Sequence, residues 1–479
     1  MDPEILKEIR ENTCGLKLDL KSRKIGDDDA KALAPALQTN TTLTCLDLSD
    51  NRIQDAGLYD LFIALLQNTA LKSLYLHTNK IRNIVEYTTD HTNTDHTNTA
   101  LTQLDLSYNS IGETGTTALI TWLGKTSLQI LDLSGNGIKD AGATALATML
   151  QTNTTLTCLK LKGDQIGDAG ATALAGALRI NGTLITLMLN NNNEIGDTGV
   201  IALVGALRIN GTLQKLDLMY TNIGDAGATA LAGVLHINTT LQKLDLSKNF
   251  IGDAGATALA GMLRANKTLQ KLDLSKNFIG DDGATVLEGA LHKNTTLQEL
   301  ELEFDVSKRP EIMIRPEIIR RIKVRLNYNI LLKKWKEIIN DKRPYKDKER
   351  QQKIIDTLHN DATELRKEAW GLYEIFTERQ IRLINSCIQR ITALGTVPRI
   401  VPGTVPGTVP WDFFNYSGNS LPLVFKKTKK SVQKSKRNKR SISTKKVLKS
   451  HKSRKSHKSR KSLKSRKSLK SVENRKYRA

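Results

Sequence analysis

A unit of about 28 residues recurs roughly ten times between Leu16 and Leu302, and this repeat constrains the fold more than any other feature of the chain. The copies that begin at Leu241 and Leu269 share the string Leu-Gln-Lys-Leu-Asp-Leu-Ser-Lys-Asn-Phe-Ile-Gly-Asp. A period of this length indicates units that stack in a row, each in contact with its neighbours. Such a stack offers a long surface for binding and has no built-in reaction centre.

Each unit contains two different periodicities. Leu244 and Leu246 alternate with polar residues, which is typical of a half-buried strand. Ala256, Leu259 and Leu263 follow at helical spacing and would lie on one face of a helix. Neither face can bury its leucines alone, so stacking is predicted to place the strands side by side in a parallel sheet. Because helices are wider than strands, we expect an α/β solenoid that curves into a horseshoe, with the sheet inside and the helices outside.

Polar residues mark the ends of these elements. Asp253 stands where a helix N-cap is expected, because its carboxylate can accept hydrogen bonds from the first helical turn. The helices are expected to end near Asn or Asn-Gly, such as Asn181-Gly182, because these residues tolerate positive φ at low cost. An asparagine after each strand can satisfy the turn backbone and form a ladder along the stack. The ladder positions are Asn51, Asn79, Asn109, Asn136, Asn249 and Asn277.

The pattern Leu-x-x-Leu-x-Leu-x-x-Asn-x-Ile resembles the leucine-rich repeat, in its ribonuclease-inhibitor-like class, and covers about 290 of the 479 residues. That class includes the repeat regions of NOD-like receptors, ribonuclease inhibitor and the GTPase activator of Ran. The resemblance implies a curved solenoid that binds proteins. No NTPase module precedes the repeats, so the chain is similar to the repeat region alone. Gly124-Lys125-Thr126 ends like a P-loop, but Leu119 replaces its required glycine.

Several units depart from the pattern. Arg23, Asp164 and Thr221 replace the ladder asparagine, so we expect the ladder to be broken there. The unit from Leu71 loses its helical pattern and contains a polar repeat at residues 90–99, which predicts a looped-out or poorly ordered replacement for its helix. The histidines and aspartates of that segment have ligand chemistry, but a slipped duplication of a polar pentapeptide explains them better. No metal or cofactor is therefore predicted.

Charge and composition divide the chain into four parts. Residues 1–305, the solenoid, have a net charge of −10. Residues 306–395 are predicted to form a helical cap and a small helical region, with Pro316 in the first turn of a closing helix. Its apolar residues at helical spacing are Ile318, Ile319, Ile322, Leu326, Ile330 and Leu331. A second helical stretch at about 347–394 either docks on the last repeats or dimerises.

The last two parts, residues 396–425 and 426–479, have no pattern of apolar residues that could form a core. Residues 396–425 contain repeated Val-Pro-Gly-Thr and an aromatic segment, which indicate a linker. Residues 426–479 hold 25 Lys and Arg against one acid, Glu473, and are predicted to be disordered. Such a tail neutralises phosphates without reading sequence, and its first cluster matches a nuclear-import pattern. The candidate residues are Lys436, Arg437, Lys439, Arg440, Lys452, Arg454, Lys455, Lys458, Arg460, Lys461, Lys464, Arg466 and Lys467.

The cysteines and the N-terminus bear on the compartment. Cys45 and Cys158 hold equivalent places four units apart, too distant to pair, which fits a reducing environment. The first residues lack the apolar core of a secretory signal, and no apolar run is long enough to span a membrane. We therefore expect an intracellular protein of the nucleus or cytoplasm. No catalytic signature is present, so we expect no enzyme.

The concave side of the sheet is the predicted place for a protein partner. Lys and Asp alternate along Lys215–Asp273, and we expect those charges to pair across neighbouring strands. Aromatic and soft apolar residues interrupt the pattern in the middle of the array, and such residues anchor interfaces. The candidate partner-binding residues are Tyr75, His77, Tyr108, Ile130, Lys160, Met188, Met219 and Tyr220. Neutral drift of these positions is the alternative.

These observations favour a non-enzymatic adaptor. Its repeat surface would hold a protein whose identity the sequence does not reveal, and its tail would tether the complex to DNA or RNA or deliver it to the nucleus. A regulator of a small GTPase, or an enzyme inhibitor acting through the concave face, is the second hypothesis. A structural protein packaged in a virion or in chromatin is the third. The oligomeric state is left open.

Overall fold

A computed structural model describes residues 1–82, 84, 98–124, 126–303, 314–340 and 361. The chain divides into two units, 1–401 and 402–479, and all described residues belong to the first. The histidine-rich segment, most of the second predicted helical stretch, the linker, the aromatic segment and the basic tail lie outside the described residues.

Short strands alternate with helices through the repeats. The strands are β1 (Lys17–Asp19), β2 (Cys45–Asp47), β3 (Ser73–Tyr75), β4 (Gln103–Asp105), β5 (Ile130–Asp132), β6 (Cys158–Lys160), β7 (Thr186–Met188), β8 (Lys215–Asp217), β9 (Lys243–Asp245), β10 (Lys271–Asp273) and β11 (Glu299–Glu301). The helices are α1 (Pro3–Arg10), α2 (Asp27–Thr39), α3 (Asp55–Gln67), α4 (Gly112–Leu123), α5 (Lys139–Thr152), α6 (Asp168–Leu178), α7 (Asp197–Leu207), α8 (Asp225–Leu235), α9 (Asp253–Leu263), α10 (Asp281–Leu291) and α11 (Pro316–Asn340).

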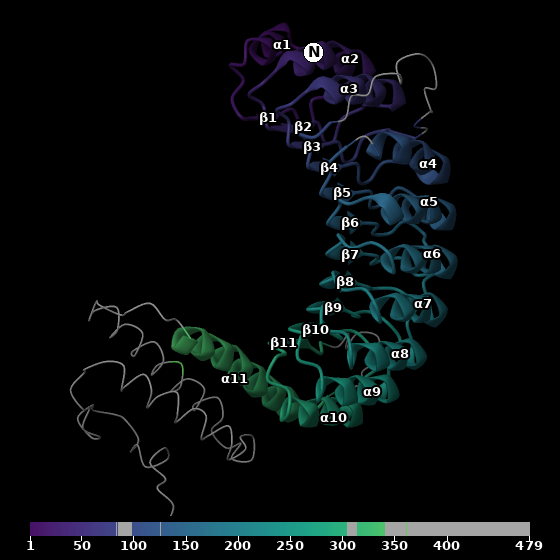
Figure 1. Ribbon diagram of the computed structural model, residues 1–479, viewed down its shortest axis with the longest axis vertical. Helices are drawn as coiled ribbons and strands as arrows, with labels where there is room; N and C mark the ends of the chain where they lie inside the picture. Colours follow the sequence, from purple (N-terminus) through teal and green to yellow (C-terminus); the bar gives the residue numbers. More distant parts are fainter. Residues whose placement is uncertain (83, 85–97, 125, 304–313, 341–360, 362–479) are drawn as a thin grey trace, which may run out of the picture. The chain divides into compact units, whose positions relative to one another are not determined.

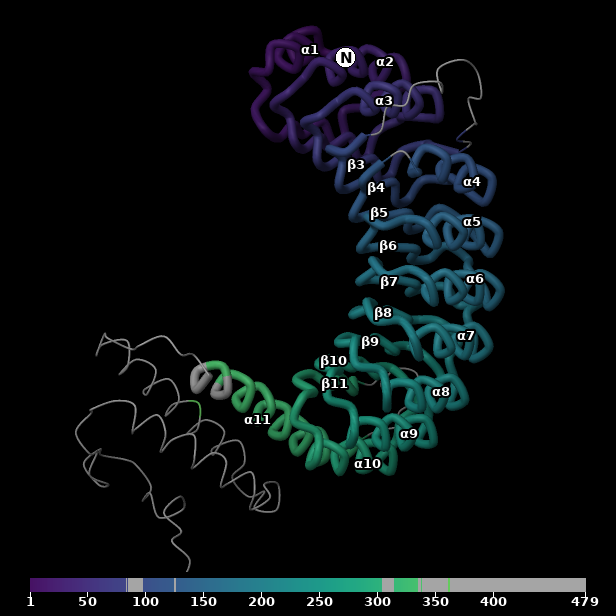
Figure 2. Tube along the Cα trace, in the orientation of Figure 1, coloured from purple at the N-terminus to yellow at the C-terminus, as the bar shows by residue number. Residues whose placement is uncertain are grey.

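The strands form one parallel sheet in sequence order, from β1 to β11. Equivalent residues of neighbouring repeats are paired, so that Leu244 lies between Leu216 and Leu272. Within the repeats the strands line the inner side of a curve and α2 to α10 lie outside it (Figures 1 and 2). This arrangement confirms the predicted solenoid.

The core lies between the sheet and the helices. Leu244, Leu246 and Ile251 of one unit are at most 1% exposed, and its helix adds Leu259 and Leu263 at 0%. The same positions are buried in the neighbouring units, so each unit completes its core with residues of the next. Deleting a whole unit would therefore leave a continuous core, whereas a unit without a neighbour would expose its apolar residues to solvent.

The asparagine ladder after the strands is confirmed. Asn249 Nδ2 donates to the carbonyl oxygen of Leu246 in its own unit (3.0 Å) and to that of Leu218 in the preceding unit (2.9 Å). Its Oδ1 accepts from the N–H of Ile223, also in the preceding unit (3.1 Å). A short buried amide thus satisfies the turn backbone of two units at once.

The predicted breaks in this ladder are only partial. Asp164 Oδ1 still accepts from the N–H of Asn136 at 2.7 Å, so the acceptor half of the ladder is kept. The Thr221 hydroxyl lies 2.9 Å from the carbonyl oxygen of Leu218 and 2.9 Å from Oδ1 of Asn249. What Asp164 loses is the pair of amide donors that an asparagine would supply.

The expected N-cap role of Asp253 is wrong. The N-cap of α9 is Gly252, which makes no side-chain cap, and Asp253 is the first helical residue. Its Oδ1 instead accepts from the N–H groups of Gly280 (2.7 Å) and Gly283 (3.0 Å) at the start of α10. Each aspartate of this type therefore caps the helix of the following unit, which a reading of one unit alone does not reveal.

The helix ends do not use the positive φ that asparagine and glycine tolerate, since neither Asn181 nor Gly182 has it. Asn40, Asn68 and Asn153 have φ between −72° and −76°. The asparagines at this position form a second ladder instead. Asn181 Nδ2 donates to the Leu150 carbonyl of the preceding unit (2.8 Å), and its Oδ1 accepts from the N–H of Leu184 (2.8 Å). The chain therefore contains two parallel rows of buried amides.

The segment that was predicted to replace the helix of the third repeat lies outside the described residues, so that prediction stays a prediction. No helix is described between β3 and β4, and residues 85–97 lie outside the described part. The rings of Phe62 on α3 and Trp122 on α4 stack with centroids 3.8 Å apart and an interplanar angle of 10°. Two large aromatic side chains thus join helices of the second and fourth repeats.

Both ends of the array are covered. Helix α1, which the sequence analysis did not predict, places Ile9 in the core. Helix α11 confirms the predicted closing helix, because Ile318, Ile322 and Leu326 are buried, although Ile330 is 43% exposed. Asn329 Nδ2 donates to the Leu297 carbonyl oxygen (2.7 Å), so α11 continues the second asparagine row past the last strand.

Candidate functional site

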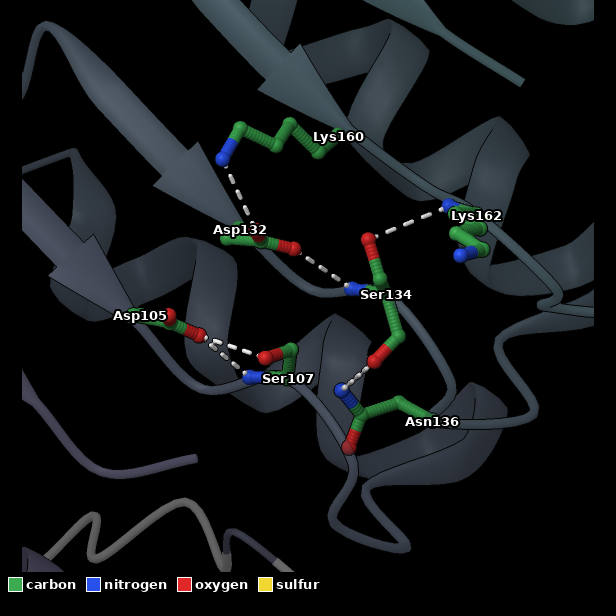
Figure 3. A network of polar contacts seen from close by, with 7 residues as sticks. All are labelled: Asp105, Ser107, Asp132, Ser134, Asn136, Lys160 and Lys162. Carbon is green, nitrogen blue, oxygen red and sulfur yellow. Dashed lines mark hydrogen bonds and ion pairs between the residues drawn. The ribbon is translucent and has the colours of Figure 1, made fainter. Parts of the chain in front are cut away.

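The candidate site is the face of the sheet that the helices leave uncovered. In most strands the middle leucine points into the core, and the residues on either side of it are only partly buried. The face therefore presents two columns of side chains, one from the first and one from the third strand position. In Figure 3, Asp105, Asp132 and Lys160 come from the third positions of β4, β5 and β6.

Aspartate at the third position has a structural role. Asp105 Oδ1 accepts from the N–H of Ser107 (2.9 Å), and Asp132 Oδ1 accepts from the N–H of Ser134 (3.1 Å; Figure 3). Such a bond holds the turn that ends the strand. The same bond is made by Asp19, Asp47, Asp217, Asp245 and Asp273.

Four strands lack this aspartate, and in three of them the third position has no carboxylate, since β11 has Glu301 there. Tyr75 on β3, Lys160 on β6 and Met188 on β7 stand at the third position and offer no carboxylate to the turn. All three are partly exposed on the open face. In the turn after β6, the N–H of Lys162 donates instead to Oγ of Ser134 in the preceding unit (3.3 Å; Figure 3).

Lys160 forms an ion pair on this face. Its Nζ lies 3.0 Å from Oδ2 of Asp132 on the neighbouring strand. Partial burial lowers the pKa of Lys160, but the charge and hydrogen bond of Asp132 outweigh burial, so its pKa is raised. The side chain stays charged at neutral pH, and 35% of its surface is exposed.

The predicted partner-binding residues fall into two groups. Tyr75 and His77 belong to β3 and its turn, whereas Ile130, Lys160 and Met188 lie on the consecutive strands β5, β6 and β7. Met219 stands in the turn after β8, next to this second group. Lys160 and Met188 are paired in register on neighbouring strands.

Tyr108 and Tyr220 stand in the turns that follow β4 and β8. Both have positive φ, 53° and 54°, and are 56% and 51% exposed. Their exposed rings leave them available for contact, and their part in partner binding stays a prediction. The ring of Tyr108 lies against Gly135, where an added Cβ would lie 2.9 Å from the ring. Any larger residue at position 135 would therefore collide with Tyr108.

The predicted pairing of charges within Lys215–Asp273 is wrong for all three of its strand lysines. Among the residues that the structure describes, neither Lys215 nor Lys243 has a carboxylate oxygen within 4.0 Å. Lys271 instead pairs with Glu299 on β11 at 2.5 Å. The aspartates of these strands are turned toward their own turns, which leaves the lysines to solvent.

Two further aromatic residues, Phe250 and Phe278, stand in the turns that follow β9 and β10. The rings of Phe250 and Phe278 stack with centroids 5.7 Å apart, and Phe250 is 56% exposed. The signal was present in the sequence, since other units carry Arg52, Lys80 or Ser110 at this position.

The described cysteines, and the described residues that could bind a metal, do not form a reactive or metal-binding site. Cys158 lies on the open face beside Ile130, and burial raises its pKa, which disfavours the reactive thiolate. Within the described residues, no cluster of His, Cys, Asp or Glu could hold a metal ion. No helix of that part is long and apolar enough to cross a membrane.

A curved stack of strand–helix units, tied by a row of asparagines after the strands, defines a leucine-rich repeat protein. A family model described as Leucine Rich repeat matches eight segments of the chain, which therefore belongs to the leucine-rich repeat family. The segments are 39–62, 97–119, 124–147, 152–175, 181–204, 210–232, 238–260 and 265–287. No curated protein matches the chain.

Several solved structures are similar in part. An internalin (inlF) of Listeria monocytogenes is 20% identical over 63% of this chain and 95% of its own, with a TM-score of 0.36. A chain of the Rad7 and Elc1 complex in yeast is 18% identical over 65% and 85%, with a TM-score of 0.35. The tropomodulin C-terminal domain of Caenorhabditis elegans is 16% identical over 35% and 98%, with a TM-score of 0.31. These likenesses are distant and do not indicate what this chain binds.

Proposed function

We propose that this chain is a non-enzymatic scaffold that binds a protein partner on the open face of its sheet. The observation that carries the proposal is the replacement of the turn-holding aspartate by Tyr75, Lys160 and Met188. Seven other strands keep this aspartate and its hydrogen bond. Giving up one such bond costs about 0.5–1.5 kcal/mol. Positions where a local rule is abandoned are expected at functional sites, even where a neighbouring residue replaces the lost hydrogen bond, as Ser134 does after β6.

The chemistry of the three residues suits a protein surface. Tyrosine buries a large rigid ring at low entropic cost, and methionine adapts to irregular shapes. Lys160 adds a charge beside Met188, and Ile130 and Met219 extend the apolar area on either side. The neighbouring strands β6 and β7 would then form the centre of the contact.

Restoring the repeat pattern tests this proposal. The double variant Lys160→Asp/Met188→Asp should fold, because Asp217, Asp245 and Asp273 already occupy this column side by side. Proteins captured by the full chain from an extract of its natural source should be missing with this variant and be kept with the control Lys17→Asp on β1. The same captured set with all three chains would contradict the proposal.

We further propose that the basic tail tethers this scaffold to nucleic acid, with nuclear import through residues 436–440 as the second role. The support is the charge distribution, because 426–479 has a net charge of +24 beside a solenoid of −10. Lysine and arginine that neutralise phosphates release counterions, so binding should weaken steeply with salt. The compartment would be the nucleus, or the cytoplasm if the tail binds RNA there.

Labelled double-stranded DNA and RNA should bind the full chain at low salt and lose most of their affinity at moderate salt. A chain that ends at residue 425 should bind neither. If both chains bind alike, or neither binds, the tether is wrong. Import would then be tested separately, by the location of a fluorescent fusion with and without Lys436, Arg437, Lys439 and Arg440.

A further inference from the structure

A row of exposed isoleucines lies at the helix ends of three consecutive repeats. Ile180, Ile209 and Ile237 each stand two residues after the last residue of α6, α7 and α8. They are 66%, 59% and 54% exposed. We call these three residues the isoleucine rim. They lie outside the sheet, so the rim is separate from Tyr75, Lys160 and Met188.

The rim has defined ends. The equivalent position is Thr152 in the preceding repeat and Ala265 and Lys293 in the two repeats that follow. Single exposed apolar residues are common on protein surfaces and need no explanation. Three large ones in adjacent repeats, bounded by small or polar residues on both sides, form a patch rather than a scatter.

Glycines leave the helix surface bare beside each isoleucine. Gly176, Gly205 and Gly233 stand four residues before Ile180, Ile209 and Ile237, and so lie on the same helix face. A Cβ built at Gly176 or Gly233 would meet no atom within 4 Å. Glycine inside a helix costs about 0.5–1 kcal/mol relative to alanine. The equivalent Gly261 and Gly289, in the two repeats without the isoleucine, are equally open, so the bare helix surface is a feature of the repeat, and only the three middle repeats combine it with an exposed isoleucine.

The surroundings of the rim are basic. Residues 172–183, 201–212, 229–240 and 257–268 contain Arg179, Arg208, Arg264 and Lys267 and no Asp or Glu. The three arginines are the C-caps of α6, α7 and α9, where a cation complements the helix dipole. The dipole accounts for these charges but not for the isoleucines beside them.

We propose that the isoleucine rim binds an acidic amphipathic helix of a partner protein. Apolar side chains of that helix would pack on Ile180, Ile209 and Ile237, and its carboxylates would face Arg179 and Arg208. Neighbouring helices pack about 8–10 Å apart, so the rim is about 16–20 Å long. A helix of three to four turns spans this length, at about 5.4 Å a turn. The charge of the chain's own tail has the wrong sign for this surface.

A designed peptide provides the first test. The probe is a fluorescein-labelled helix of about 18 residues with Leu at i, i+4, i+7 and i+11 and Glu at the solvent-facing positions. The full chain should bind it, and Ile209→Glu should weaken binding about tenfold or more, as expected for a central anchor. The matched control is Leu16→Glu, since Leu16 is 64% exposed but lies beside β1.

A second peptide and a second variant distinguish the causes. The same peptide with Lys for Glu should bind about tenfold more weakly, because Arg179 and Arg208 repel it. Gly233→Ala should weaken the acidic peptide while stabilising the fold, so that lost binding cannot reflect unfolding. Circular dichroism should show that each variant keeps its helix content.

Several results would overturn the proposal. They are no binding of the acidic peptide up to about 1 mM, equal binding by Ile209→Glu, or preference for the Lys peptide. Binding of phosphatidylserine vesicles that Ile209→Glu abolishes, without peptide binding, would assign the rim to a lipid surface. Concentration-dependent self-association in sedimentation that the same variant abolishes would assign it to a second copy. None of these outcomes depends on the open sheet face.

Discussion

The carboxylate of Asp253 accepts a hydrogen bond from the N–H of Gly283, which belongs to the next repeat (Oδ1···N 3.0 Å). The two residues are so close that a Cβ at Gly283 would lie 2.5 Å from this oxygen. The glycines at the equivalent positions 57, 170, 227 and 255 make room for the aspartate of the preceding unit in the same way, whereas Gly142 lies against Thr116 instead. This contact explains why the aspartate and the glycine both recur in the repeat. It also couples each helix to the one before it.

Gly283→Ala should destabilise the solenoid by about 1–3 kcal/mol. The added methyl group would displace the Asp253 carboxylate and would also meet Ile279 Cγ2 at 2.9 Å. Urea unfolding followed by circular dichroism measures the change. The control is Gly233→Ala in α8, where space is open and alanine should stabilise by about 0.5–1 kcal/mol. If Gly283→Ala stabilises the chain as Gly233→Ala does, or leaves it unchanged, the inter-repeat contact is unimportant.

Asp253→Ala should destabilise the chain by about 0.5–2 kcal/mol, the usual loss for a helix cap. Two N–H groups at the start of α10 would lose their acceptor. Asp253→Asn keeps Oδ1 and should cost less. Hydrogen exchange gives a local measure, because exchange of the Gly280 and Gly283 amides should accelerate in the alanine variant while that of Gly170 stays unchanged. Faster exchange at both ends of the array would point to global unfolding instead.

Asp164 should make stability depend on pH. It is fully buried, its Oδ2 has no hydrogen-bond partner, and burial raises its pKa to about 7 against the opposing hydrogen bond from Asn136. The folded state therefore holds a proton that the unfolded state releases near pH 4. The free energy of unfolding should fall by a few kcal/mol as pH rises from about 4 to about 7, and should then level off.

Asp164→Asn should remove this dependence and raise stability most above pH 7. The amide would also supply the two donors that the other ladder asparagines give to leucine carbonyls. Unfolding in urea at pH 5 and pH 8 compares the two chains. If the pH dependence is the same for both, the buried carboxyl is not its source.

Arg325 should be essential for holding α11 on the last repeat. Its side chain is 1% exposed, its Nε lies 3.9 Å from Glu288 Oε1, and its Nη2 lies 2.8 Å from Nδ1 of His292. Burial lowers its pKa to about 10, so it remains charged. Arg325→Ala would leave Glu288 buried without this cation, at a cost of about 3 kcal/mol. The control is Lys323→Ala, on an exposed position of the same helix.

Hydrogen exchange should locate that effect. In a solenoid each unit contacts only its neighbours, so protection should fall first in α10 and α11 and remain in α5 and α6. An Arg325→Ala chain with unchanged protection at α10 would show that the apolar contacts of Ile318 and Ile322 are sufficient.

The repeat period and its leucines determined the fold without any structure. Stacking of the units is the only way to bury Leu244, Leu246 and Ile251. Asn249 then lies where its amide can donate to carbonyl groups of its own unit and of the preceding one. The closing helix at Pro316 followed from the same logic, because an open solenoid end exposes apolar residues such as Ile322. These features are local or depend on exact repetition, and both are visible in the sequence.

Contacts between units were decided by the tertiary structure. From the sequence of one unit, Asp253 is interpreted as the cap of its own helix, because that unit offers its carboxylate no other N–H group. Only stacking brings Gly280 and Gly283 to its carboxylate and gives Asn181 a carbonyl of the preceding unit. The open-face candidates depend on the same step, since the parallel pairing of β6 with β5 and β7 places Lys160 beside Asp132 and Met188.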